Sequence, residues 1–158
     1  SWINSFWKCK YHLPDSLTEN VHAFLNNEFY SINENDGGSE IMGDRNIYKN
    51  SFRYKNILEA RSLKTKFLMN ELPKHVSHYI LICYEDLQND FENVMRRLET
   101  EFNVSVISEN FPENITTYKK TNQQYIPRPI EEYEITREMI AMTPNFDIDT
   151  ELLLSSKI

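Results

Sequence analysis

Residues 78–87 carry the sequence His-Tyr-Ile-Leu-Ile-Cys-Tyr-Glu-Asp-Leu, in which an unbroken apolar run ends at the acidic pair Glu85 and Asp86. Apolar and polar residues do not alternate inside this run. A strand with one solvated face would alternate, so the run predicts a strand that is covered on both faces, as in a parallel sheet. We expect the strand to end at Tyr84, at the carboxyl edge where open α/β sheets bind their ligands.

Amphipathic helices are predicted on both sides of this strand. The helix before it covers residues 55–72 and is closed by Pro73, because proline cannot continue a helix. The helix after it covers residues 91–102, with Asp90 or Asn89 as its cap and apolar residues at spacings of three and four. Helix, buried strand and helix in succession are typical of an α/β layer.

Two further helices are predicted near the amino terminus. The first covers about residues 2–11 and is ended by Pro14. Ser16 and Glu19 match a capping box, which predicts the start of the second helix. Apolar stripes mark the inner faces: Trp2, Phe6 and Cys9 on the first helix, and Val21, Phe24, Leu25 and Phe29 on the second.

The rest of the chain contains loops and a helical end. Residues 31–44 hold all three glycines and predict a surface loop, and residues 118–129 predict a polar loop. A helix over residues 131–142 is broken by residues 143–145, Thr-Pro-Asn, and a final short helix covers residues 147–154. The inward residues of the helix over 131–142 are predicted to be Ile135, Met139 and Met142.

Composition limits the classes of protein to consider. The 158 residues suffice for a single domain, residues 1–158, and no apolar run approaches the roughly 18 residues of a membrane span. A net charge of −7 weighs against nucleic-acid binding, because phosphate backbones favour basic surfaces. Cys9 and Cys83 are expected to be buried free thiols. The four histidines are scattered, so no metal site is predicted.

A few residues have the chemistry to hold a nucleotide, and each has a plainer alternative. Ser5 offers a hydroxyl near a helix start, although local sequence alone favours a surface serine. Tyr84 can stack on a base or complete the core. Lys119 and Lys120 can bind a phosphate or remain solvated in their loop. The basic residues of the helix over 55–72 are interpreted as a solvated face.

Three stretches together resemble the carboxyl-terminal part of the sulfotransferases that use 3′-phosphoadenosine 5′-phosphosulfate. Residues 81–87, Leu-Ile-Cys-Tyr-Glu-Asp-Leu, with the helix behind them, are similar to the strand that ends in Tyr-Glu-Asp-Leu in that family. Residues 2–7, Trp-Ile-Asn-Ser-Phe-Trp, resemble the helix after its Arg-Asn/Asp-Pro motif. Residues 54–61, Tyr-Lys-Asn-Ile-Leu-Glu-Ala-Arg, look like the helix before its central strand.

The resemblance implies an α/β three-layer, P-loop-like fold with a parallel sheet that is incomplete at its amino-terminal side. It implies that Ser5 holds the 3′-phosphate and that Tyr84 lies against the adenine of the donor. Lys119 and Lys120 lie where the family often has a basic phosphate loop, although the glycine of that loop is missing. Residues 31–54 would border the acceptor.

The implied reaction is sulfuryl transfer to a hydroxyl or amine of a small-molecule or glycan acceptor. The catalytic residue is not identified, because the phosphate loop and the usual base of the family precede the matched region. We therefore expect the chain to be an amino-terminally truncated fragment that is inactive alone. Two alternatives stay open: a non-catalytic binding or interaction module that keeps the fold, and another P-loop-type transferase such as a kinase relative. The acceptor, compartment (cytoplasm or Golgi lumen) and oligomeric state stay open.

Overall fold

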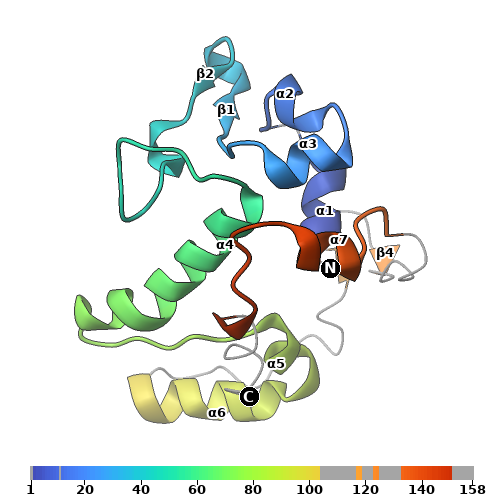
Figure 1. Cartoon of the computed structure of the whole chain (residues 1–158). Coiled ribbons are helices and arrows are strands. Elements are labelled where there is room, and N and C mark those ends of the chain that lie inside the picture. The colour runs from blue at the N-terminus through green and yellow to red at the C-terminus, as the bar shows by residue number, and fades with distance from the viewer. Residues whose placement is uncertain (1, 11, 104–116, 119–122, 125–132, 151–158) are drawn as a thin grey trace.

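The computed structural model describes residues 2–10, 12–103, 117–118, 123–124 and 133–150, and these combine helices with two small sheets (Figure 1). Seven α-helices are assigned in these ranges: α1 (Trp2–Lys8), α2 (Asp15–Thr18), α3 (Val21–Asn26), α4 (Ile57–Lys66), α5 (Tyr84–Asn89), α6 (Phe91–Phe102) and α7 (Arg137–Met142). Residues 148–150 are also helical. Short 3₁₀ turns are formed by Glu34–Asp36, Met42–Asp44 and Leu72–Lys74.

The strands are short and antiparallel. Two of them, β1 (Ile32–Asn33) and β2 (Ser39–Glu40), form a hairpin within the predicted loop over residues 31–44, and the other two, β3 (Thr117–Tyr118) and β4 (Gln123–Gln124), form a second pair. The first hairpin turns at Gly37, whose φ of 64° lies in the left-handed region that favours glycine. No parallel pair occurs among the residues that the structure describes, so the predicted parallel sheet is not seen there.

The predicted strand over residues 78–84 is wrong for this structure. Residues 79–83 form no strand and are only half-buried, and Tyr84 begins α5. Two physical causes account for this difference. Asp86 lies in the first turn of α5, where its carboxylate accepts a hydrogen bond from the Cys83 N–H at 3.2 Å and so caps the helix. A strand also needs a neighbouring backbone to pair with, and the described residues place none beside this run.

The predicted helix over residues 55–72 is confirmed, and it begins and ends on local signals. The Asn56 side chain accepts a hydrogen bond from the Glu59 N–H at 2.8 Å and caps α4. After α4, the chain continues through a π-helical segment (Phe67–Glu71) into the 3₁₀ turn that contains Pro73. The helix predicted after Asp90 is confirmed as α6.

The remaining helix predictions are partly confirmed. Helix α1 lies within the predicted range, but the capping box is wrong: Ser16 lies inside α2, and Asn20 caps α3 by accepting from the Ala23 N–H at 2.9 Å. Helix α7 begins only at Arg137, after the cap residue Thr136. Of the residues predicted to face inward, Ile135 is buried as expected, whereas Met139 and Met142 are exposed.

The hydrophobic core lies among the amino-terminal helices and α4. The Phe24 ring lies 5.2 Å from the Trp7 ring and 6.0 Å from the Phe6 ring, measured between centroids. Packing of this kind favours burial because aromatic side chains remove large apolar areas from water. The buried members are Ile3, Trp7, Leu13, Leu17, Phe24, Leu25, Phe29, Tyr54, Ile57, Leu58, Ala60 and Ile135.

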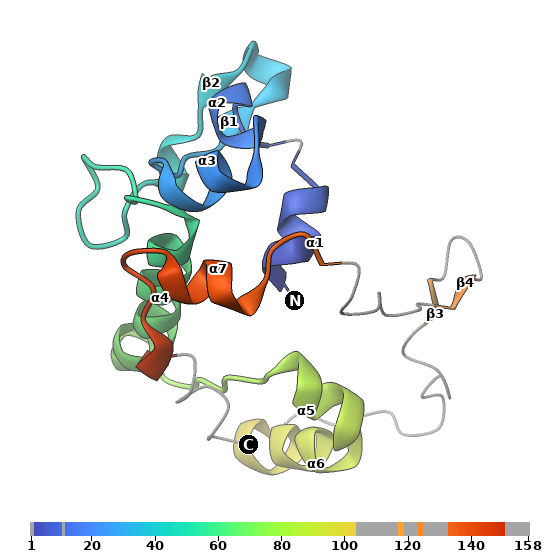
Figure 2. The ribbon, with the colours of Figure 1, turned by 45° about the vertical axis from the view of Figure 1, so that its right-hand side comes forward.

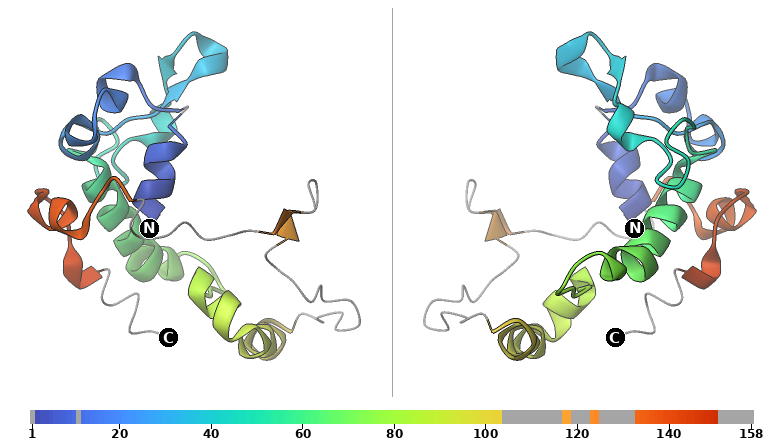
Figure 3. Two further views of the ribbon diagram at one scale, coloured as in Figure 1. Left: turned by 90° about the vertical axis from the view of Figure 1, so that its right-hand side faces the viewer. Right: turned by 90° about the vertical axis from the view of Figure 1, so that its left-hand side faces the viewer.

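The carboxyl-terminal segment around α7 lies against α1 and α4 (Figures 2 and 3). Asn56 donates to the Pro144 carbonyl at 2.8 Å, and Ser62 accepts from the Asp147 N–H at 3.2 Å. Lys66 forms an ion pair with Asp147. Side chains of α4 therefore hold a segment that follows them by about 85 residues.

Helices α5 and α6 lie side by side beyond the carboxyl-terminal end of α4 in all views (Figures 1, 2 and 3). The His78 ring lies 5.9 Å from the ring of Phe102, which connects the start of the apolar run to the end of α6. The half-buried run over residues 79–83 therefore leads from α4 into a separate helical pair.

Candidate nucleotide groove

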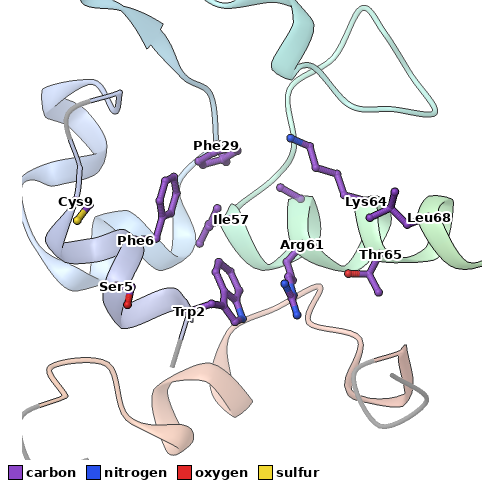
Figure 4. Close-up of a pocket in the computed structure, with 11 residues that line it drawn as sticks. Trp2, Ser5, Phe6, Cys9, Phe29, Ile57, Arg61, Lys64, Thr65 and Leu68 are labelled. Carbon is purple, nitrogen blue, oxygen red and sulfur yellow. The ribbon is translucent and has the colours of Figure 1, made fainter. Parts of the chain in front are cut away.

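An open groove of about 580 Å³ lies between α1 and α4 (Figure 4). Residues at spacings of three and four along α4 and just beyond it share one helical face and form one wall. Two of them, Arg61 and Lys64, are cations. The groove is lined by Trp2, Ser5, Phe6, Cys9, Phe29, Ile57, Ala60, Arg61, Lys64, Thr65 and Leu68.

The groove combines aromatic rings with positive charge. The Arg61 guanidinium lies 5.0 Å from the centre of the Trp2 ring, within the range of a cation–π contact. The Lys64 ammonium lies 3.8 Å from a carboxylate oxygen of Asp44, and the Lys64 side chain is 45% exposed. The basic face of this helix was predicted to be solvated only, but Arg61 and Lys64 also line the groove.

Ser5 lies on α1 with an exposed side chain at the wall of the groove. The same helix buries Ile3, Asn4 and Trp7 on its opposite side, so the hydroxyl of Ser5 is directed away from the core. Cys9, one turn further along, also lines the groove and is exposed. Both cysteines are free, as predicted, but Cys9 is not buried and Cys83 is only half-buried.

The described part of the structure does not place the other predicted ligand residues at this groove. Tyr84 is the first residue of α5, and its side chain lies outside the described part of the chain. Lys119 and Lys120 also lie outside the described residues. Convergence of these residues with Ser5 stays a prediction.

A second, smaller cavity of about 360 Å³ lies on the other side of Lys64. Tyr54 lines it with a fully buried side chain, and the Ile47 N–H donates to the Tyr54 hydroxyl at 3.0 Å. Burial raises the pKa of Tyr54, so the hydroxyl stays protonated. Sequence patterns gave no signal for this cavity, because a loop and a helix form it together. It is lined by Met42, Gly43, Arg45, Ile47, Asn50, Tyr54 and Lys64.

An ion-pair network fixes the loop that forms this second cavity. Arg53 donates two hydrogen bonds to the carboxylate of Glu40, at 2.8 and 3.1 Å, and its guanidinium lies 3.7 Å from the centre of the Tyr30 ring. The Nε atom of Arg45 lies 3.3 Å from the same carboxylate. The hydrogen bond from Arg53 holds the pKa of Glu40 below its usual value. The loop over residues 41–54 is therefore tied to the hairpin of β1 and β2.

The described part of the chain contains neither a metal cluster nor a membrane-spanning helix. No group of three or more histidine, cysteine, aspartate or glutamate side chains there is arranged to hold a metal ion. Within the same ranges, no helix has the length and apolar character to cross a bilayer.

The sequence matches no protein-family model, no curated protein and no solved structure. The family resemblance therefore rests on the three stretches of sequence quoted above.

Proposed function

We propose that the chain is the nucleotide-binding part of a sulfotransferase that uses 3′-phosphoadenosine 5′-phosphosulfate, with the groove between α1 and α4 as the donor site. The observation that carries this proposal is the position of Ser5. It lines the same groove as Arg61 and Lys64, so a hydroxyl and two cations border one space. Two of the three stretches that resemble the family, residues 2–7 and residues 54–61, supply opposite walls of that groove.

The groove fits the chemistry of such a donor. Ser5 and Arg61 can each donate a hydrogen bond to a phosphate oxygen, and charge-assisted bonds of this kind are the stronger class. Trp2, Phe6 and Phe29 offer aromatic surface for a base. When bound, the donor supplies the sulfuryl group. The acceptor hydroxyl or amine gains that group and loses a proton, and adenosine 3′,5′-bisphosphate leaves. No residue is assigned here as the base.

The proposal includes the three-layer fold with a parallel sheet that the resemblance implies. Residues 79–83 form no strand in the structure, so this part of the proposal rests on the family resemblance alone. Tyr84, Lys119 and Lys120 would then complete the nucleotide site from its other side.

The direct test is a chemical-shift titration of the chain with adenosine 3′,5′-bisphosphate, compared with adenosine 5′-monophosphate. The bisphosphate should shift the amides of Ser5 and Arg61 with a dissociation constant of roughly millimolar size. Ser5→Ala and Arg61→Gln should each weaken binding about tenfold. Lys74→Gln is the matched control, because Lys74 pairs with Glu71 outside the groove.

Alkylation of Cys9 provides a second readout, because its exposed thiol lines the groove. The bisphosphate should slow this reaction several-fold, and the monophosphate should slow it less. Equal shifts and equal protection by the two nucleotides would show that the 3′-phosphate is not recognised, and the donor assignment would then be wrong.

A non-catalytic binding module is the second candidate, and the apolar lining of the groove favours it. Most of the residues on its walls are aromatic or aliphatic, so an apolar ligand without phosphate also fits. Under this alternative, the neutral fluorescent probe N-phenyl-1-naphthylamine would bind in the groove, and the bisphosphate would not displace it. Displacement of the probe by the bisphosphate would favour the sulfotransferase.

A further inference from the structure

Lys64 lies between the two cavities and lines both of them. On one side is the groove between α1 and α4, and on the other is the cavity enclosed by the loop over residues 42–50. A ligand in either space therefore lies beside the same lysine side chain. Arginine and lysine are the cations among the lining residues of the smaller cavity, and no aspartate or glutamate is among the described residues that line it.

Hydrogen-bond donors dominate the polar lining of this smaller cavity. The Tyr54 hydroxyl already accepts from the Ile47 N–H at 3.0 Å, and within the described residues its own proton meets no acceptor. Among the described residues, the Lys64 ammonium lies 3.8 Å from a carboxylate oxygen of Asp44 and 5.8 Å from the centre of the Tyr54 ring, and it has three protons to donate. Asn50 is exposed and adds an amide. A fully buried tyrosine whose proton has no acceptor favours a ligand that brings acceptor oxygens.

The cations of this cavity are only partly neutralised. Glu40 is shared between Arg45 and Arg53, and Arg53 also lies 3.7 Å from a carboxylate oxygen of Glu28, so Arg45 shares its carboxylate. Arg45 also donates to the Ser51 carbonyl at 3.1 Å, which fixes its guanidinium beside the cavity. The arrangement suits an oxyanion, because a lysine and a tyrosine, both hydrogen-bond donors, line one space that no described carboxylate lines.

We propose that the cavity between the loop over residues 42–50 and α4 is a second binding subsite, which takes a carboxylate or sulfate group carried by the acceptor. Its assignment to the acceptor rests on the proposed sulfotransferase function, because Lys64 would then stand between donor and acceptor. The binding of an oxyanion does not depend on that function.

The experiment uses the full chain with glucuronate as the carboxylate probe, inorganic sulfate as the free anion and glucose as the neutral control. Backbone amide shifts of Gly43, Ile47 and Asn50 are followed in each titration. Glucuronate should shift them at least fivefold more strongly than glucose at equal concentration. Lys64→Gln should weaken glucuronate binding about fivefold to tenfold. Tyr54→Phe, if its melting curve shows that it folds, should weaken binding by a similar factor.

Lys49→Gln is the matched control, because it removes the same charge from the same loop and does not line the cavity. It should leave glucuronate binding unchanged. If Lys49→Gln and Lys64→Gln weaken binding equally, or if glucose competes with glucuronate, the subsite is overturned. Sulfate that binds as tightly as glucuronate would support an oxyanion site and overturn its restriction to an acceptor-borne group.

Ser5→Ala separates this subsite from the proposed function, because Ser5 lines only the larger groove. Ser5→Ala should weaken binding of the bisphosphate and leave binding of glucuronate unchanged. If the bisphosphate does not bind but glucuronate binding still depends on Lys64, the donor assignment fails and the oxyanion subsite stands. If the bisphosphate binds at Ser5 and glucuronate causes no shifts, the subsite fails and the donor assignment stands.

Discussion

The Asn4 side chain forms two hydrogen bonds with the backbone of Ile135: it donates to the Ile135 carbonyl at 2.9 Å and accepts from the Ile135 N–H at 3.0 Å. Both residues are buried. One amide thus satisfies both backbone groups of a residue that lies 131 positions away in the sequence. This pair joins α1 to the carboxyl-terminal segment and helps to hold the wall of the groove that carries Ser5.

Asn4→Ala should lower the free energy of unfolding by about 2–4 kcal/mol, because it leaves two buried backbone groups without partners. Urea denaturation of the variant measures this loss. Asn35→Ala is the control, since Asn35 is exposed on the turn before Gly37, and it should change stability by less than about 0.5 kcal/mol. Equal effects of the two substitutions would contradict the role of Asn4.

Phe24→Ala should destabilise the chain by about 3–5 kcal/mol, because it opens a cavity beside Phe6 and Trp7 in the core. Phe52 offers a matched control, being 64% exposed. Phe52→Ala should stay within about 0.5 kcal/mol of the wild type. Thermal denaturation of both variants tests the position of the core, and similar melting temperatures for the two would place the core elsewhere.

Ionisation of Asp147 should make the free energy of unfolding depend on pH in the acidic range. Its hydrogen bond from Lys66, with further bonds from Thr150, lowers the pKa of this carboxyl from 3.8 to about 2. Because this pKa is lower in the folded than in the unfolded state, ionised Asp147 stabilises the fold above pH 4. This contribution to the free energy of unfolding is lost as the pH falls toward 2. Because the Lys66 side chain is 43% exposed, we expect about 1–2 kcal/mol after allowance for screening.

Asp147→Asn tests this dependence, since the amide cannot titrate. The variant should be less stable than the wild type at pH 7 and about equally stable near pH 2, as measured by chemical denaturation. Asp149→Asn serves as the control, because Asp149 is exposed on the same segment. A constant difference between Asp147→Asn and wild type from pH 7 to pH 2 would show that this carboxyl is not the titrating group.

Asp86→Ala should loosen α5, because it removes the carboxylate that accepts from the Cys83 N–H. Loss of a helix cap costs about 0.5–2 kcal/mol, so amide exchange across Tyr84–Asn89 should become about twofold to thirtyfold faster. Glu92→Ala, an exposed acidic position on α6, should leave these rates unchanged. Unchanged exchange in Asp86→Ala would show that this carboxylate does not stabilise the start of α5.

Local sequence determined those helices that carry their own start, stop or spacing signals. The amphipathic pattern of residues 55–72, with Pro73 after it, and the apolar spacing of residues 91–102 predicted α4 and α6 correctly, because a helix satisfies its backbone with residues only four positions away. Ser5 was also found from sequence as a candidate, and it does line the groove. The sequence showed Arg61 as a basic residue of its helix, but it did not predict that Arg61 lines this groove.

Tertiary structure decided the features that depend on distant partners. Residues 79–83 have the composition of a buried strand, yet a strand forms only where another backbone pairs with it, and the described residues provide none there. Ile135 is buried and Met142 is 84% exposed, because Ile135 exchanges two hydrogen bonds with the Asn4 side chain and α7 begins only after Ile135. Both cavities lie between separate segments of the chain, so the periodicity of one segment cannot reveal them.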